Sequence, residues 1–115
     1  MKQHESTSHG IRKHAWPELP REALTAQMTR RTVSGERLTL AQYEFVAGSV
    51  VPTHAHPNEQ ITYVLQGVLR IWVGEDADAQ GDERCQVIAA NEFIVIPAGV
   101  PHRAVAARDT VSLDI

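Results

Sequence analysis

The chain of 115 residues has a single cysteine, Cys85. One cysteine excludes a disulfide within the chain and is typical of a protein from the reducing cytoplasm. Because this thiol stands alone between Arg84 and Gln86, we interpret it as a strand residue rather than a nucleophile.

Long apolar runs and long basic runs are also missing, and we expect no secretory leader. No apolar run approaches the roughly 20 residues that cross a bilayer, and the N-terminus is polar. The net charge is −3, and no basic run is longer than Arg30-Arg31, which argues against a nucleic-acid binder. We therefore expect a cytoplasmic protein whose partner is a small molecule, and neither nucleic acid nor a membrane.

Sustained helical periodicity is the third absence. The only helix we predict is one short turn over residues 20–24, with a proline at its start. Short β-rich runs separated by turn residues follow instead, which predicts an all-β sandwich or barrel. We expect strands at residues 27–33, 38–46, 50–52, 61–65, 68–73, 84–89, 93–96, 102–107 and 110–115, with a possible edge strand at 11–16.

The domain organisation follows from the same pass along the chain. Residues 1–10 are almost devoid of apolar side chains, so we expect a flexible N-terminal segment with solvated histidines at His4 and His9. Residues 11–115 form one domain. The acidic stretch 74–82 contains three aspartates, as a calcium loop would, but its spacing does not place the glycine and the terminal Glu that an EF-hand requires. We interpret it as a solvated hairpin connection.

Three histidines carry the chemistry that we expect. His54 and His56 are one residue apart, and alternate residues of a strand point to the same face. His102 follows the tight turn Pro97-Ala-Gly99, and Gln60 lies four residues beyond His56. Three imidazoles and one amide oxygen suit one divalent transition metal such as Mn, Fe, Co, Ni or Zn. The alternative is a pocket whose histidines are only hydrogen-bonded.

The spacing of these residues resembles the two motifs of the cupin superfamily, specifically its small single-domain members. The first motif, G-x5-H-x-H-x3,4-E-x6-G, is matched over 48–67 with Gln60 in place of Glu. The second, G-x5-P-x-G-x2-H-x3-N, is matched over 91–106, with Asn91 and Ala106 in place of its first Gly and last Asn. The resemblance implies a double-stranded β-helix, a metal inside one end of a barrel, and a homodimer.

Glu59 is the competing choice for the acidic ligand position. The six-residue spacing to Gly67 counts from Gln60, and neighbouring strand residues point to opposite faces. We therefore assign the position to Gln60. The same parity turns Thr62 and Val64 inward, and it gives His102, Ala104 and Ala106 a common face. The neutral amide leaves the ion its full charge, which weakens affinity and strengthens Lewis acidity.

A narrower resemblance is to cupins that linearise unsaturated uronates in pectin and alginate breakdown. In that group an Asp on the last strand, followed by Phe and Arg, is catalytic. Asp114 matches that position, while the Phe and Arg have no counterpart before the chain ends at Ile115. We carry three hypotheses: a metal-dependent isomerase or lyase on a sugar acid with Asp114 moving a proton, a dioxygenase using O2, and a non-enzymatic binding module.

Overall fold

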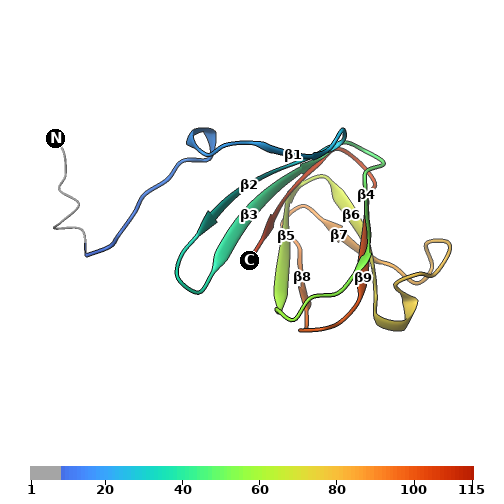
Figure 1. Ribbon diagram of the computed structural model, residues 1–115. Helices are drawn as coiled ribbons and strands as arrows, with labels where there is room; N and C mark the ends of the chain where they lie inside the picture. The colour runs from blue at the N-terminus through green and yellow to red at the C-terminus, as the bar shows by residue number, and fades with distance from the viewer. Residues whose placement is uncertain (1–8) are drawn as a thin grey trace.

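A computed structural model describes residues 9–115 (Figure 1). Almost all of the regular structure is β, as the sequence predicts. The strands are β1 (Glu22–Thr25), β2 (Met28–Ser34), β3 (Thr39–Phe45), β4 (Val50–His54), β5 (Gln60–Gln66), β6 (Val68–Val73), β7 (Gln86–Ala89), β8 (Phe93–Ile96), β9 (His102–Ala106) and β10 (Thr110–Asp114). Two single 3-10 turns accompany them, η2 (Trp16–Glu18) and η3 (Gly74–Asp76).

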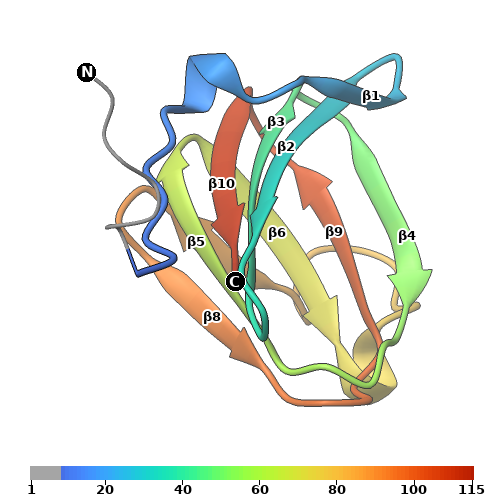
Figure 2. The same ribbon diagram turned by 60° about the vertical axis from the view of Figure 1, so that its left-hand side comes forward.

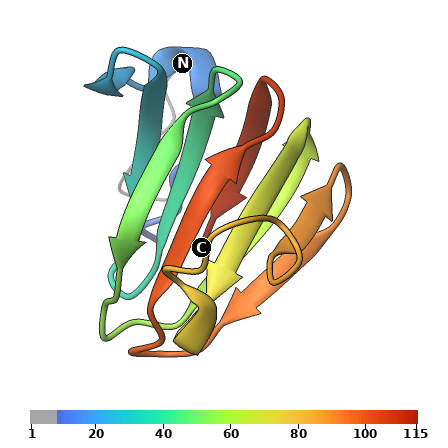
Figure 3. The ribbon, with the colours of Figure 1, turned by 90° about the vertical axis from the view of Figure 1, so that its right-hand side faces the viewer.

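The strands form two antiparallel sheets that face each other. The larger sheet has the order β1-β2-β3-β10-β5-β8, and the smaller has the order β4-β9-β6-β7. Figure 2 shows β8 and β4 at opposite sides of the molecule, and Figure 3 shows β4, β9 and β6 side by side. The sandwich is confirmed. The barrel is not closed, because strands at the edges of one sheet make no ladder with the other.

Side chains that alternate between the inner and outer faces of the strands form the interior. On β5, Thr62 and Val64 are buried with exposed fractions of 3% and 0%, and on β9 the buried residues are His102 and Ala106. Both inward parities predicted from the sequence are confirmed. The central apolar cluster consists of Met28, Phe45, Val64, Leu69, Ile71, Ile88 and Ala106.

Two motif positions are explained by backbone conformation. Gly67 has a φ of +92°, and a Cβ placed there would overlap the Asp109 carbonyl oxygen and the Thr110 side chain. Only glycine fits this turn. Asn91, which stands where the second motif has glycine, has a φ of +69°. Asn is among the few residues that adopt this left-handed conformation, so the turn survives the substitution.

The N-terminal predictions need correction. Residues 20–24 do not form a helical turn, because Glu22 and Ala23 pair with Arg30 and Thr29 in the β1–β2 ladder. The turn occurs earlier, at η2, where Pro17 occupies a first-turn position. Residues 11–15 form no strand and run away from the body of the molecule (Figure 1). The expected flexible segment 1–10, including His4, lies largely outside the described residues.

The acidic stretch 74–82 connects β6 and β7 and lies against the smaller sheet (Figure 3). Arg103 donates from Nε to the Ala77 carbonyl at 2.8 Å and from Nη2 to the Ala79 carbonyl at 2.7 Å. Thr53 donates to Asp78 at 2.7 Å. Within residues 9–115, no helix has the length and apolar character needed to cross a bilayer.

Candidate metal centre

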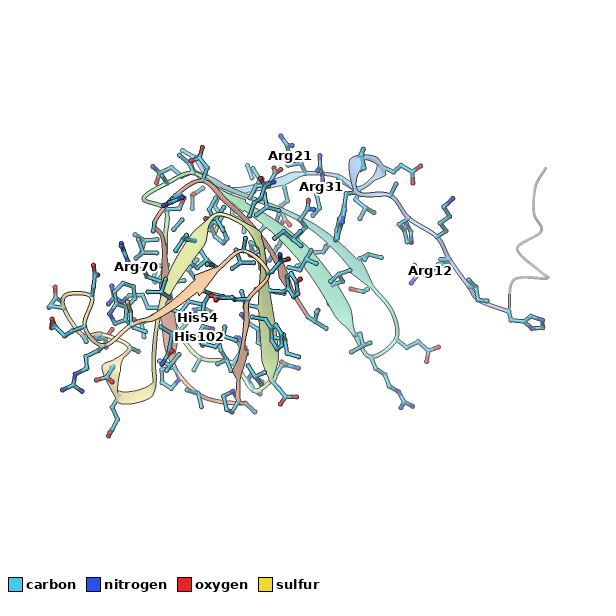
Figure 4. All side chains as sticks on the ribbon, turned by 180° about the vertical axis from the view of Figure 1, so that it is seen from behind. Arg12, Arg21, Arg31, His54, Arg70 and His102 are labelled. Carbon is cyan, nitrogen blue, oxygen red and sulfur yellow. The ribbon has the colours of Figure 1, made fainter. Side chains whose placement is uncertain are left out.

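The three histidines meet at one end of the sandwich interior. His54 ends β4 and His102 begins β9, and the two residues are direct partners in the β4–β9 ladder. Their ring centroids are 4.3 Å apart, and the ring of His56 lies 5.5 Å from His54 and 5.1 Å from His102. Figure 4 shows His54 and His102 next to each other. Of the three histidines, His54 is exposed, His56 is partly buried and His102 is buried. Their potential ligand nitrogens all lie within 4.8 Å of one another.

An irregularity in β4 turns His54 inward. Val51 pairs with Ala104 and lines the interior cavity, but the register then shifts before His54 pairs with His102. Thr53 meanwhile bonds to Asp78 of the 74–82 connection. In a regular strand, residues three apart point to opposite faces, so the shift is what places both Val51 and His54 inside. His56 lies beyond the end of β4, so the expectation of two histidines on one strand is wrong, although both reach the cavity.

Backbone carbonyls fix the orientation of all three rings. The Nδ1 atoms of His54, His56 and His102 lie 3.0, 2.8 and 3.0 Å from the carbonyl oxygens of Pro52, Asn58 and Val100. A carbonyl oxygen only accepts hydrogen bonds, so each Nδ1 carries the proton and each neutral ring has its lone pair on Nε2. This tautomer leaves Nε2 available to a metal.

The Nε2 atom of His102 differs from those of the other two histidines in its surroundings. It is buried and has no hydrogen-bond partner within residues 9–115. Burial lowers the pKa of His102 below its ordinary value, against an opposing effect of the Val100 carbonyl, and the nearby His54 and His56 lower it further. The ring is therefore held neutral, with an unused lone pair directed into the site.

Gln60 completes the cluster from β5. Its Nε2 donates to Thr62 Oγ1 at 2.8 Å and to Asp114 Oδ2 at 3.3 Å, which fixes the orientation of the amide. The oxygen Oε1 then faces His56 Nε2 at 2.9 Å. Two lone pairs cannot stabilise each other at this distance, so a proton or a cation must lie between them. An unpartnered imidazole and an opposed pair of acceptors fit a divalent transition metal bound by nitrogen and oxygen.

Asp114 lies on β10 and accepts a hydrogen bond from Gln60 of β5. It is the ladder partner of Thr62, whose hydroxyl donates to Asp114 Oδ1 at 2.8 Å. Burial raises the pKa of Asp114 to about 6, while the hydrogen bond from Thr62 and the electrostatic influence of His56 and His54 act in the opposite direction. A carboxyl group with a pKa near neutrality, next to a cluster of this kind, is suited to moving a proton.

A cavity of about 260 Å³ is lined by all five predicted site residues. Its polar end is formed by His54, His56, Gln60, His102 and Asp114, and its apolar end includes Phe45, Leu69 and Ile96. Glu59 is exposed and does not line this cavity.

Sequence reasoning missed the part that Thr62 plays. Its inward orientation follows from parity, but its two hydrogen bonds depend on the β5–β10 register, which no local pattern reveals. The signal that was available is a threonine two residues from Gln60 on the same face of a strand.

Solved structures of other proteins share this architecture. KdgF from a Halomonas species has a TM-score of 0.73 at 23% identity, with 85% of this chain and 84% of that chain covered. An RmlC-like cupin from Shewanella frigidimarina has a TM-score of 0.74 at 22% identity, covering 88% and 85%. Oxalate decarboxylase from Bacillus subtilis has a TM-score of 0.73 at 17% identity, but only 28% of that chain is covered.

Sequence comparison gives the family directly. No curated protein matches the chain. The sequence model of the cupin domain, however, matches residues 41–114, a stretch that contains both histidine motifs and all five predicted site residues. Since this match spans well over half of the chain, the protein belongs to the cupin family.

Proposed function

We propose that this protein is a metal-dependent enzyme that isomerises or cleaves a small sugar-acid-like substrate. His54, His56, Gln60 and His102 hold one divalent transition metal in this proposal. The observation that carries it is the unsatisfied inner surface of the cluster. His102 Nε2 has no partner within residues 9–115, and Gln60 Oε1 faces an acceptor nitrogen. When bound, the metal supplies Lewis acidity toward a carbonyl or ring oxygen of the substrate.

The protein's own residues orient the substrate and move the proton. Asp114 Oδ2 has only a long hydrogen bond from Gln60, so this oxygen is the one that gives or takes the proton. Thr62 holds the other oxygen and keeps the carboxyl group in place. The apolar end of the cavity excludes water from the reacting group.

Three observations support the choice of substrate class. The motif region resembles that of cupins that linearise unsaturated uronates, and Asp114 occupies the position of their catalytic Asp. KdgF is among the structures with the same fold. The cavity of about 260 Å³ also suits a molecule of the size of a monosaccharide acid.

Metal analysis combined with an activity assay tests the proposal. Purified protein should contain close to one divalent metal per chain by elemental analysis, and unsaturated monouronates should lose their absorbance when the metal-loaded protein is added. Oxygen consumption with enol substrates and no uronate turnover would favour the dioxygenase. Protein that neither retains nor takes up a divalent metal would refute the metal-enzyme proposal.

Association into a homodimer is a further part of the proposal. The outer face of the larger sheet exposes Leu65, Phe93 and Val95, with exposed fractions of 40%, 60% and 50%. Apolar side chains concentrated on one sheet face favour contact with a second copy. Sedimentation equilibrium should therefore give a dimer mass, and Phe93→Glu should shift it toward the monomer. A monomer at micromolar concentration in the unaltered protein would contradict this expectation.

A further inference from the structure

A second hollow adjoins the metal centre. It is a groove of about 630 Å³ that shares His56, Gln60 and Asp114 with the centre and has Arg30 on its other side. The β2–β3 hairpin, whose first strand includes Arg30, projects away from the smaller sheet in Figure 1. The groove therefore gives solvent access to the polar end of the interior.

Strand register places Arg30 on the inner face of the larger sheet. Met28, two residues earlier on β2, is buried in the core, so Arg30 has the same parity. Arg30 pairs with Tyr43 of β3, and Tyr43 pairs with Ser112 of β10, two residues before Asp114. Two steps of about 4.8 Å separate β2 from β10. A long arginine side chain and a small ligand together can span that separation.

The guanidinium group of Arg30 is fixed on one side and available on the other. Its Nε and Nη2 donate to the same oxygen of Glu22, at 3.1 and 2.8 Å. The side chain is 32% exposed and lines the groove, so the guanidinium is accessible to a ligand there. Hydrogen bonding with Tyr43 and then with Glu22 raises the pKa of Arg30 above its ordinary value. The groove thus holds a permanent cation whose orientation is fixed by Glu22.

The opposite side of the groove has the reverse charge. Asp114 and Glu59 line it near the metal centre. Arg37 also lines the groove. A ligand whose carboxylate binds the guanidinium of Arg30 would have the rest of the molecule directed toward the metal centre.

We propose that Arg30 binds the carboxylate of the substrate while the neutral end of the same molecule lies at the metal centre. This inference rests on the proposed function of that centre and makes the substrate class more specific, a small monocarboxylate rich in hydroxyl groups. Arg30 is a binding residue in this scheme, because its guanidinium contacts the carboxylate and not the reacting atoms. Carboxylate recognition by an oriented arginine fork is both strong and directional.

Titration calorimetry with D-galacturonate and with its uncharged methyl ester tests the proposal. The metal-loaded protein should bind the acid, and the ester should bind about ten- to hundredfold more weakly, since it lacks the charge-assisted hydrogen bonds. Arg30→Gln should weaken binding of the acid by the same factor and leave binding of the ester unchanged. Arg30→Lys should keep part of the affinity, because an ammonium retains the charge but not the fork.

Arg70 provides the matched control. It lies on β6 in the smaller sheet, 3.9 Å from Asp82, and lines neither hollow. Arg70→Gln removes the same charge and should leave the affinity for the acid unchanged. Equal affinity of the unaltered protein and Arg30→Gln overturns the proposal, as does equal binding of acid and ester or no binding of the acid at all.

Repeating the titrations on chelator-treated protein separates this proposal from the proposed function. Arg30-dependent binding by a protein that never retains metal would refute the metal enzyme and leave the role of Arg30 intact. Stoichiometric metal with binding that ignores Arg30 would refute the role of Arg30 alone. Thermal unfolding of each variant checks that the altered chains remain folded.

Discussion

The two ends of the interior are built from the same strands but differ in how completely their groups are satisfied. On β5, Val64 is fully buried in the apolar cluster, while Gln60, four residues earlier on the same face, belongs to the metal centre. At the apolar end, the buried side chains pack against one another. At the polar end, a ring nitrogen of His102 is buried with no partner within residues 9–115. Packing at one end therefore supports an unsatisfied, reactive arrangement at the other.

Removing a ligand from the polar end should have the largest effect. His102→Ala takes away the buried nitrogen that has no other partner, so we expect metal retention to be lost altogether. Elemental analysis after gel filtration measures this. His14→Ala removes an exposed histidine and is the matched control, which should keep the full metal content. Unchanged metal occupancy in His102→Ala would contradict the ligand assignment.

Truncating the apolar end should affect stability and leave the metal in place. Val64 has an exposed fraction of 0%, so Val64→Ala should lower the free energy of unfolding by about 2 kcal/mol. Leu65→Ala, on the opposite face and 40% exposed, should cost far less. Chemical denaturation gives the two values. Loss of metal in the folded Val64→Ala protein would show that the two ends are not separable in this way.

Disturbing the support of the centre should have the smallest effect. Thr62→Val keeps the shape but removes the acceptor for Gln60 and the donor to Asp114. We expect metal affinity to fall about tenfold, the lower range for residues that orient ligands. Competition with a chelator measures it. Thr29→Val removes a hydroxyl that bonds to Glu44 away from the cavity and should change nothing. Equal affinity in the two variants would remove Thr62 from the site.

Much of this arrangement can be predicted from the sequence because it depends on local spacing. Alternation along 60–64 gives the inward faces of Thr62 and Val64, and the motif spacing selects Gln60 over Glu59 for the cavity. The left-handed turn at Asn91 is also compatible with the residue found there. These features are determined by neighbouring residues, so one sequence is enough to predict them.

Features that depend on pairing between distant strands were not predictable. The strand at Glu22–Thr25 exists because β2 offers a free edge, whereas its own residues resemble a helix start. The contact of Thr62 with Asp114 requires the β5–β10 register. The same holds for Arg30, whose place in the groove follows from its pairing with Tyr43. Whether the two sheets close into a barrel likewise depends on pairing between their edge strands, which are distant in the sequence.

The register shift in β4 has a consequence for how this chain can change through evolution. His54 points inward only because one extra residue is accommodated between Val51 and His54. Deleting Pro52 or Thr53 would leave Val51 and His54 two residues apart, the spacing at which a regular strand points both side chains to the same face. Substitutions at Pro52 or Thr53 that keep the bulge would preserve the site. The inward direction of His54 can therefore survive the loss of one residue, whereas straightening the bulge with every residue retained would turn His54 toward solvent.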